Sequence, residues 1–129
     1  MKNNSVLSID QMSQIRKLGI DTSKASMCWV KSPEGEYRLH IHDEYCYEAN
    51  FMEPAPTFTL QDILEMMPKE IEGRFLTLCY DYGGYHIEYS YYYDPMNESQ
   101  HKGKSFLEAA YNTLCWLAES GYLGKEDEG

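Results

Sequence analysis

Histidine and carboxylate side chains on two predicted hairpins are the first residues whose spacing indicates chemistry. His40 and His42 alternate onto one face of a predicted strand, and His86 lies on a second hairpin with Asp81 and Glu88 on the same face. Imidazole and carboxylate groups are zinc ligands, so one hypothesis is a small metal-dependent enzyme, provided that the strands are neighbours. The alternative is structural: Asp81 pairs with His86 across the hairpin, and His40 and His42 are solvated. We favour this alternative and predict neither a metal nor another cofactor.

The sequence contains no recognisable enzyme motif. A phosphate-binding loop, a nucleophile elbow, a zinc signature and a dinucleotide-binding fingerprint are all absent. Gly83-Gly84 is interpreted as a turn because no helix start follows it. The adjacent acids Asp43-Glu44 and the acidic run 126–128 are typical of solvated loop and tail charges. We therefore predict no catalytic residue and favour a protein that is not an enzyme.

The charge balance limits the class of partner. Twenty-one acids against eleven bases give a formal net charge of −10, and the segments 43–53 and 75–101 contain no Lys or Arg. Nucleic acids and anionic membranes are bound mainly through basic side chains, so we expect neither as a direct partner. An acidic inhibitor or nucleic-acid mimic that acts on a basic protein stays open as an alternative. That alternative requires Asp43, Glu44, Glu48 and Glu53 to form one surface with Asp81 and Glu88.

The four cysteines lie at positions 28, 46, 79 and 115, and no two of them form a C-x-x-C pair. The first residues lack the apolar segment of a secretion signal, and no apolar run approaches the roughly 20 residues of a membrane span. These features predict reduced thiols and a cytoplasmic protein. Cysteines inside strand and helix patterns are expected to act as small buried hydrophobic residues.

Three helices are predicted from apolar periodicity and capping signals. The first spans residues 9–18, with Ser8 and Gln11 as a capping box, and the second spans 60–67, with Thr59 as N-cap. The third begins after Ser105 and ends at Gly121, and its wide apolar face should pack against a sheet. Residues 125–129 form an acidic tail that we expect to be disordered, which leaves one domain over residues 1–124.

Two hairpins are predicted, and each is assigned a register. The segments 75–82 and 85–93 flank Gly83-Gly84, which pairs Tyr82 with Tyr85 and puts Leu78 and Ile87 on the apolar face. The segments 27–31 and 36–42 flank a four-residue loop, which pairs Trp29 with Arg38. The fold class that follows is α+β: a mainly antiparallel sheet of about four strands, with three helices packed on one face.

Aromatic side chains on the outer faces indicate a binding surface. Seven of the twelve tyrosines fall between positions 80 and 93. These tyrosines either pack at the rim of the hydrophobic core or contact a binding partner. Interface hot spots are enriched in Trp, Tyr and Arg. We expect an exposed patch of such residues to be covered by another part of the chain or by a partner protein. The predicted binding residues are Trp29, Arg38, His40, Phe75 and Tyr92. The predicted function is a non-enzymatic protein-interaction module, with a homodimer as one form of it.

Three stretches carry a resemblance to known proteins. They read LGIDTS before MCW, TFTLQDIL before PKEI, and AAYNTLCWL before GYL, within residues 18–29, 57–71 and 109–123. Together they resemble small proteins carried by phages and mobile elements of anaerobic gut bacteria. The resemblance implies cytoplasmic expression from mobile DNA, and it carries over no catalytic residue.

Overall fold

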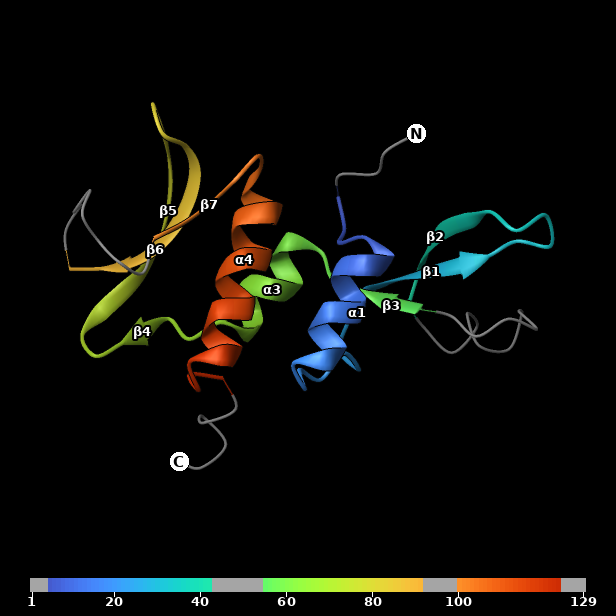
Figure 1. The fold of residues 1–129 in the computed structure, drawn as a ribbon, viewed down its shortest axis with the longest axis horizontal. Helices are drawn as coiled ribbons and strands as arrows, with labels where there is room; N and C mark the ends of the chain where they lie inside the picture. The colour runs from blue at the N-terminus through green and yellow to red at the C-terminus, as the bar shows by residue number, and fades with distance from the viewer. Residues whose placement is uncertain (1–4, 43–54, 92–99, 124–129) are drawn as a thin grey trace. The chain divides into compact units, whose positions relative to one another are not determined.

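The computed structural model describes residues 5–42, 55–91 and 100–123 of the chain (Figure 1). Contacts within the chain group it into two compact units, Met1–Asp62 and Ile63–Gly129, and each is described here by itself. The single domain expected over residues 1–124 stays a prediction. The acidic tail, residues 125–129, lies outside the described residues.

The first unit contains one helix and a three-stranded antiparallel sheet. Helix α1 (Ile9–Lys17) begins at the predicted capping box, in which Ser8 Oγ accepts from the Gln11 amide at 3.1 Å. The strands β1 (Met27–Lys31), β2 (Tyr37–Ile41) and β3 (Ala55–Thr57) pair in the order β2-β1-β3. Leu7, Met12, Ile15 and Phe58 are the largest apolar side chains buried in this unit.

The first hairpin exists as predicted, but its register is wrong by one residue. Trp29 pairs with Leu39, and Arg38 pairs with Val30. The loop has three residues rather than four, because the Ser32 amide donates to the Glu36 carbonyl at 2.6 Å and Gly35 takes a positive φ of 90°. A glycine in the left-handed region is typical of a three-residue hairpin loop. A slip of one residue exchanges the faces, so Trp29 and Arg38 lie on opposite faces of the hairpin.

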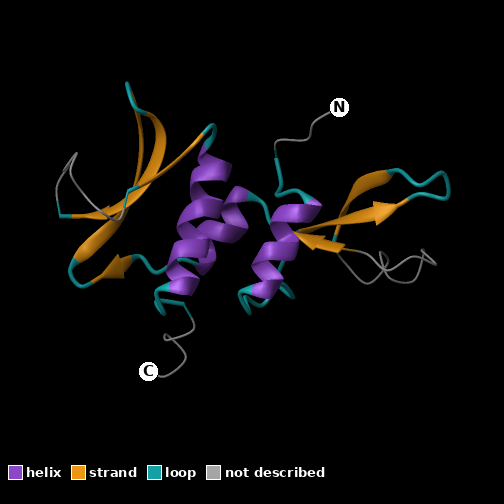
Figure 2. Ribbon diagram, in the orientation of Figure 1, coloured by secondary structure: helices purple, strands orange, loops and turns teal. Residues whose placement is uncertain are grey.

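The second unit contains a four-stranded antiparallel sheet in the order β4-β5-β6-β7. Helix α3 (Leu60–Met66) contains the boundary between the two units. In the chain it precedes the four strands, and helix α4 (Phe106–Glu119) follows them. Helix α4 packs against β6 and β7 (Figure 2). The bounds of the strands are β4 (Glu70–Ile71), β5 (Arg74–Asp81), β6 (Gly84–Ser90) and β7 (His101–Gly103).

The register of the second hairpin is wrong by two residues, whereas the residues that share each face are as predicted. Tyr80 rather than Tyr82 pairs with Tyr85, and the loop is Tyr82-Gly83. The Asp81 carboxylate accepts from the Gly83 amide at 2.8 Å, and Gly84, with φ of 90°, begins β6. Because side chains alternate with a period of two, this slip leaves every residue on its predicted face.

The α+β class is confirmed, but the single sheet of about four strands is wrong. The two hairpins lie in separate sheets of three and four strands. Short strands that carry no alternating pattern complete each sheet: β3 contains Pro56, and β7 has three residues. Within the described ranges, no helix is long and apolar enough to cross a membrane.

Candidate functional site

The predicted aromatic–arginine patch does not form on the first hairpin. Trp29 is half-buried, and its indole Nε1 donates to the Leu7 carbonyl at 3.0 Å, so the chain before α1 covers it. Arg38 and His40 are exposed and share the opposite face with the buried Val30. Their predicted grouping with Trp29 is therefore wrong, because it depended on the register that the three-residue loop changes.

The two remaining predicted binding residues lie elsewhere in the chain. Phe75 is at the start of β5 in the second unit, and its side chain is 57% exposed. Tyr92 falls outside the described residues. The acidic surface required by the inhibitor alternative depends on residues 43–53, which also fall outside them.

The three histidines of the predicted metal site are not on neighbouring strands. His40 is on β2, and His42 follows it, with its Nδ1 2.8 Å from the Ala25 carbonyl oxygen. His86 is on β6, which belongs to the other sheet. The predicted cross-strand pair of Asp81 with His86 is wrong, because Cys79 is opposite His86 and Asp81 is opposite Gly84. The Asp81 carboxylate nevertheless lies 3.8 Å from His86 Nδ1.

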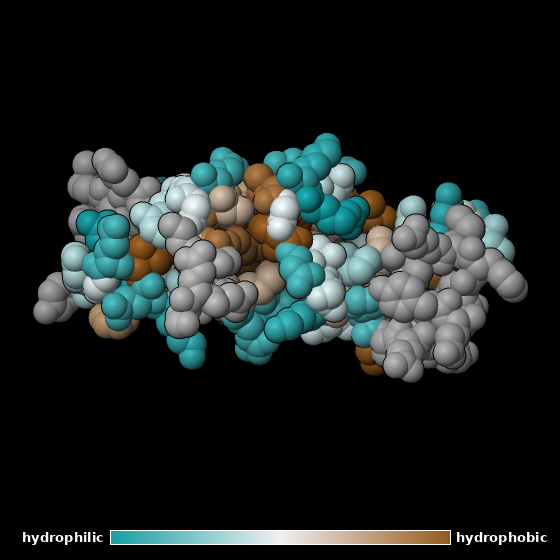
Figure 3. Space-filling model, turned by 90° about the horizontal axis from the view of Figure 1, so that it is seen from below, coloured by the Kyte–Doolittle hydropathy of each residue, from teal (hydrophilic) through white to brown (hydrophobic). Residues whose placement is uncertain are grey.

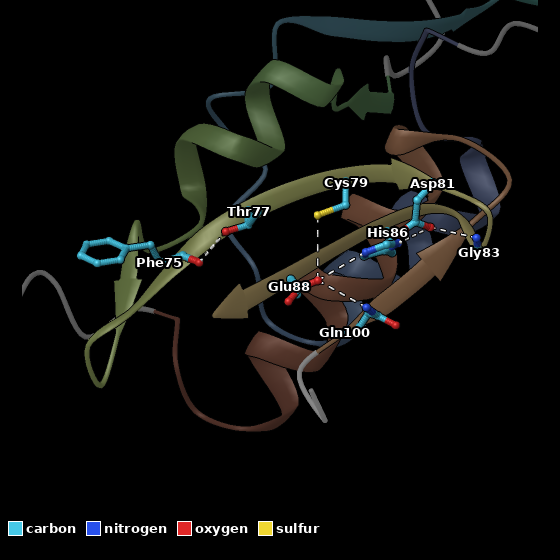
Figure 4. Close-up of polar contacts among 8 residues, drawn as sticks. All are labelled: Phe75, Thr77, Cys79, Asp81, Gly83, His86, Glu88 and Gln100. Atoms are coloured by element: carbon cyan, nitrogen blue, oxygen red, sulfur yellow. Dashed lines mark hydrogen bonds and ion pairs between the residues drawn. The ribbon is translucent and has the colours of Figure 1, made fainter. Parts of the chain in front are cut away.

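A cluster of polar side chains surrounds His86 on one face of the second sheet (Figure 4). Glu88 is at its centre: its Oε1 lies 3.3 Å from His86 Nε2 and 3.9 Å from Cys79 Sγ. The Gln100 amide donates to the same oxygen at 3.3 Å. We call Cys79, Asp81, His86, Glu88 and Gln100 the polar cluster.

The polar cluster is buried to a degree that is unusual for its chemistry. His86 is 2% exposed and Glu88 is fully buried. Among the described residues, neither ring nitrogen of His86 has a hydrogen-bond partner. Burial raises the pKa of the Cys79 thiol, and the carboxylates of Glu88 and Asp81 raise it further. A buried carboxylate and an imidazole without hydrogen bonds are costly unless a counter-charge or a ligand compensates them.

Sequence reasoning missed the contribution of Cys79 to this cluster. The predicted hairpin already put Cys79, His86 and Glu88 on one face, but Cys79 was interpreted as a small buried hydrophobic residue. Gln100 carried no signal, since it precedes a strand that the sequence pattern did not indicate. Cys79 and Cys115 are free thiols, whereas Cys28 is disulfide-bonded, so the prediction of reduced thiols is wrong for Cys28.

The opposite face of the second hairpin exposes large apolar side chains on β5. Leu78 is 38% exposed and Tyr80 is 68% exposed, and we call this pair the β5 surface. The Tyr80 ring lies 4.5 Å from that of Tyr85, which lies 4.9 Å from Phe106 of α4. Figure 3 shows one side of the molecule, on which hydrophobic residues are visible between hydrophilic ones.

The β5 surface adjoins an open backbone edge. Strand β4 pairs with β5 only at Arg74 and Phe75, and the Leu76 amide donates to the Lys69 carbonyl at 3.0 Å. In an antiparallel pair, alternate residues direct their amide and carbonyl groups away from the partner strand. Leu78 and Tyr80 follow Leu76 in this alternation, so their backbone groups point to the same edge as its amide. Among the described residues, no strand pairs with this edge beyond Leu76.

Comparison with models of known protein families, with curated proteins and with solved structures finds no match for this chain.

Proposed function

We propose that the protein is a protein-interaction module that self-associates through the open edge of β5. The observation that carries this proposal is the coincidence of two features at Leu78 and Tyr80: exposed apolar side chains, and backbone groups that pair with no described strand. An exposed strand edge is a template for pairing with another chain. Strand addition obtains affinity from main-chain hydrogen bonds and specificity from the alternating side chains.

A second copy of the same edge is a chemically suitable partner. Two β5 strands related by a two-fold axis run antiparallel, and a C2 interface brings the same patch of each copy together. In a register centred on Cys79, Leu78 lies opposite Tyr80 of the partner subunit. This register puts the partner's Thr77 opposite Asp81, so no two acids face each other in spite of the net charge of −10.

Tyr80 is well prepared for such a contact. Its ring stacks against Tyr85, which packs edge-on against Phe106, so little side-chain freedom remains to be lost on binding. Tyrosine adds a large apolar area with a polar tip, and it is over-represented among interface hot spots. The rings of Tyr80, Tyr85 and Phe106 thus form a continuous contact from the exposed edge of β5 to helix α4.

The salt response separates self-association from the acidic-inhibitor alternative. Two copies that each carry a charge of −10 repel one another, and added salt screens this repulsion. Self-association through an uncharged edge therefore strengthens as the salt concentration rises. Binding of an acidic surface to a basic partner weakens under the same change.

Sedimentation velocity over a concentration series tests the proposal. We expect a concentration-dependent dimer, and we expect Tyr80→Lys to weaken it by about 30-fold or more, the loss typical of a hot spot worth ~2 kcal/mol. Tyr37→Lys is the matched control, since Tyr37 is 48% exposed on β2, an edge strand of the other sheet. A wild-type protein that stays monomeric, or two variants that behave alike, contradicts the proposal.

A further inference from the structure

We propose that Cys79, His86 and Glu88 bind a transition-metal dication, with Zn²⁺ as the best fit. This inference goes beyond the proposed self-association and is independent of it. The three ligand atoms lie within 4.8 Å of one another, and the two side chains of β6 are at least 98% buried, at 2% exposure for His86 and 0% for Glu88.

The distances between these atoms are close to the edges of a zinc coordination tetrahedron. Bonds of about 2.0–2.1 Å to nitrogen or oxygen and about 2.3 Å to sulfur give edges of roughly 3.3–3.7 Å. The observed separations are 3.3 Å between His86 Nε2 and Glu88 Oε1 and 3.9 Å between Cys79 Sγ and Glu88 Oε1. All three atoms lie within 4.8 Å of one another, so one ion could contact them after adjustment of the side chains.

The sheet itself produces this arrangement. His86 and Glu88 are two positions apart on β6, so their side chains project from the same face. Cys79 is directly opposite His86 in the register of β5 and β6, and thus projects from that face as well. Ligands on two paired strands are held by backbone hydrogen bonds, which is the rigid support that a metal site requires.

The donor set selects the metal by charge and by softness. One thiolate and one carboxylate neutralise a dication, which compensates for burying Glu88. A sulfur and an imidazole nitrogen favour Zn²⁺ over Mg²⁺ and Ca²⁺, which take oxygen ligands. Three protein ligands leave a fourth position for water or another small ligand, as in zinc sites that perform chemistry.

The surrounding groups fit this assignment of ligand atoms. The nitrogen of His86 near Glu88 is Nε2, whereas the Asp81 carboxylate lies 3.8 Å from Nδ1. A carboxylate beside the second ring nitrogen fixes the tautomer of a metal-bound histidine. Asp81 is itself oriented by the Gly83 amide at 2.8 Å, and the Gln100 amide donates to Glu88 Oε1. Figure 4 shows these side chains converging on Glu88 and His86.

Titration of chelator-treated, reduced full-length protein with Co²⁺ and then Zn²⁺ tests the inference. We expect one equivalent of Co²⁺ to give a thiolate-to-metal charge-transfer band that one equivalent of Zn²⁺ removes. In Cys79→Ser the band should disappear and the affinity should fall more than about 100-fold, since loss of an outer-shell partner alone costs about 10- to 100-fold. Asp81→Asn tests that outer shell: the band should persist, with an affinity about 10- to 100-fold lower.

Cys115→Ser is the matched control, because Cys115 is the other free thiol of the described residues and lies on α4. It should bind like the wild-type protein. Circular dichroism establishes that each variant is folded, and Asp81→Asn keeps all three ligands should Cys79→Ser fail to fold. The inference is overturned if the wild-type protein binds no metal, or if the charge-transfer band follows Cys115 rather than Cys79. In either case the contact of His86 with Glu88 is a buried polar contact and not a metal site.

Discussion

Asp62 links the start of α3 to the start of β1, and its replacement by alanine should strongly destabilise the first unit. Its Oδ2 accepts from the amides of Ser26 and Thr59, both at 3.0 Å, and its Oδ1 accepts from Ser26 Oγ at 2.5 Å. The Thr59 hydroxyl in turn accepts from the Asp62 amide at 3.1 Å. Asp62 is 8% exposed, so water does not easily replace these contacts.

The magnitude follows from the contacts that Asp62→Ala removes. Loss of the helix-capping interaction costs about 1 kcal/mol. Hydrogen bonds to a charged acceptor contribute about 1.5–3 kcal/mol, and those from Ser26 are lost as well. We expect the free energy of unfolding to fall by about 2–4 kcal/mol, a large share of the ~5–15 kcal/mol of a typical domain.

The pH dependence of this effect has a defined sign. Burial raises the pKa of Asp62, but the hydrogen bonds from Ser26 and Thr59 together outweigh it, so the pKa is lowered. A lowered pKa in the folded state contributes stability above the pKa of the unfolded state, which is lost as the pH falls through the folded value. The difference between wild-type and Asp62→Ala should therefore be full at pH 7 and shrink below about pH 4.

Urea unfolding at pH 7 and at pH 3 measures both effects. Asp10→Ala is the control, since Asp10 is an exposed acid in the first turn of α1 and its loss should cost less than about 0.5 kcal/mol. The reasoning is refuted if Asp62→Ala costs no more than Asp10→Ala at pH 7, or if its cost is the same at both pH values.

Two further substitutions test the packing within each unit. Gly103→Ala should destabilise the second unit by about 1–3 kcal/mol, because an added Cβ would lie 2.5 Å from the Ala109 backbone nitrogen. An unchanged melting temperature for Gly103→Ala would refute this packing. Gly84→Pro is unsuitable as a comparison, because proline cannot adopt the positive φ of Gly84. Trp29→Phe should cost about 0.5–1.5 kcal/mol in urea unfolding through loss of the indole N–H bond to the Leu7 carbonyl, and a cost near zero would mean that the chain before α1 does not hold Trp29.

The helices and the two hairpins could be predicted because local signals determine them. Capping residues Ser8, Thr59 and Ser105 stand at the starts of the three helices, and the described helices begin at the following residues. The registers could not be predicted with the same security. A slip of two residues leaves both faces unchanged, so the apolar pattern of β5 and β6 cannot detect it. On the first hairpin, the left-handed conformation of Gly35 shortens the loop by one residue and exchanges the faces.

The candidate sites were predictable only in part. The alternation of side chains along the strands correctly placed Asp81, His86 and Glu88 on one face. The polar character of that face, however, led to the prediction that it is exposed to solvent. All five residues from His86 to Ser90 are buried instead, so β6 is covered on both faces. Burial of a second face depends on tertiary packing, which a two-residue period does not encode. Phe75 is exposed as predicted, whereas the β5 surface comes from residues that the pattern assigned to the interior.

Amide hydrogen exchange resolved by residue, measured at low and high protein concentration, tests the central claim most directly. In the monomer the amides of Leu78 and Tyr80 should exchange quickly, because they point to the open edge. At concentrations that favour the dimer they should become protected, while the amide of Cys79, which faces β6, should change little. Unchanged exchange at Leu78 and Tyr80 in a protein that demonstrably dimerises would contradict pairing through β5.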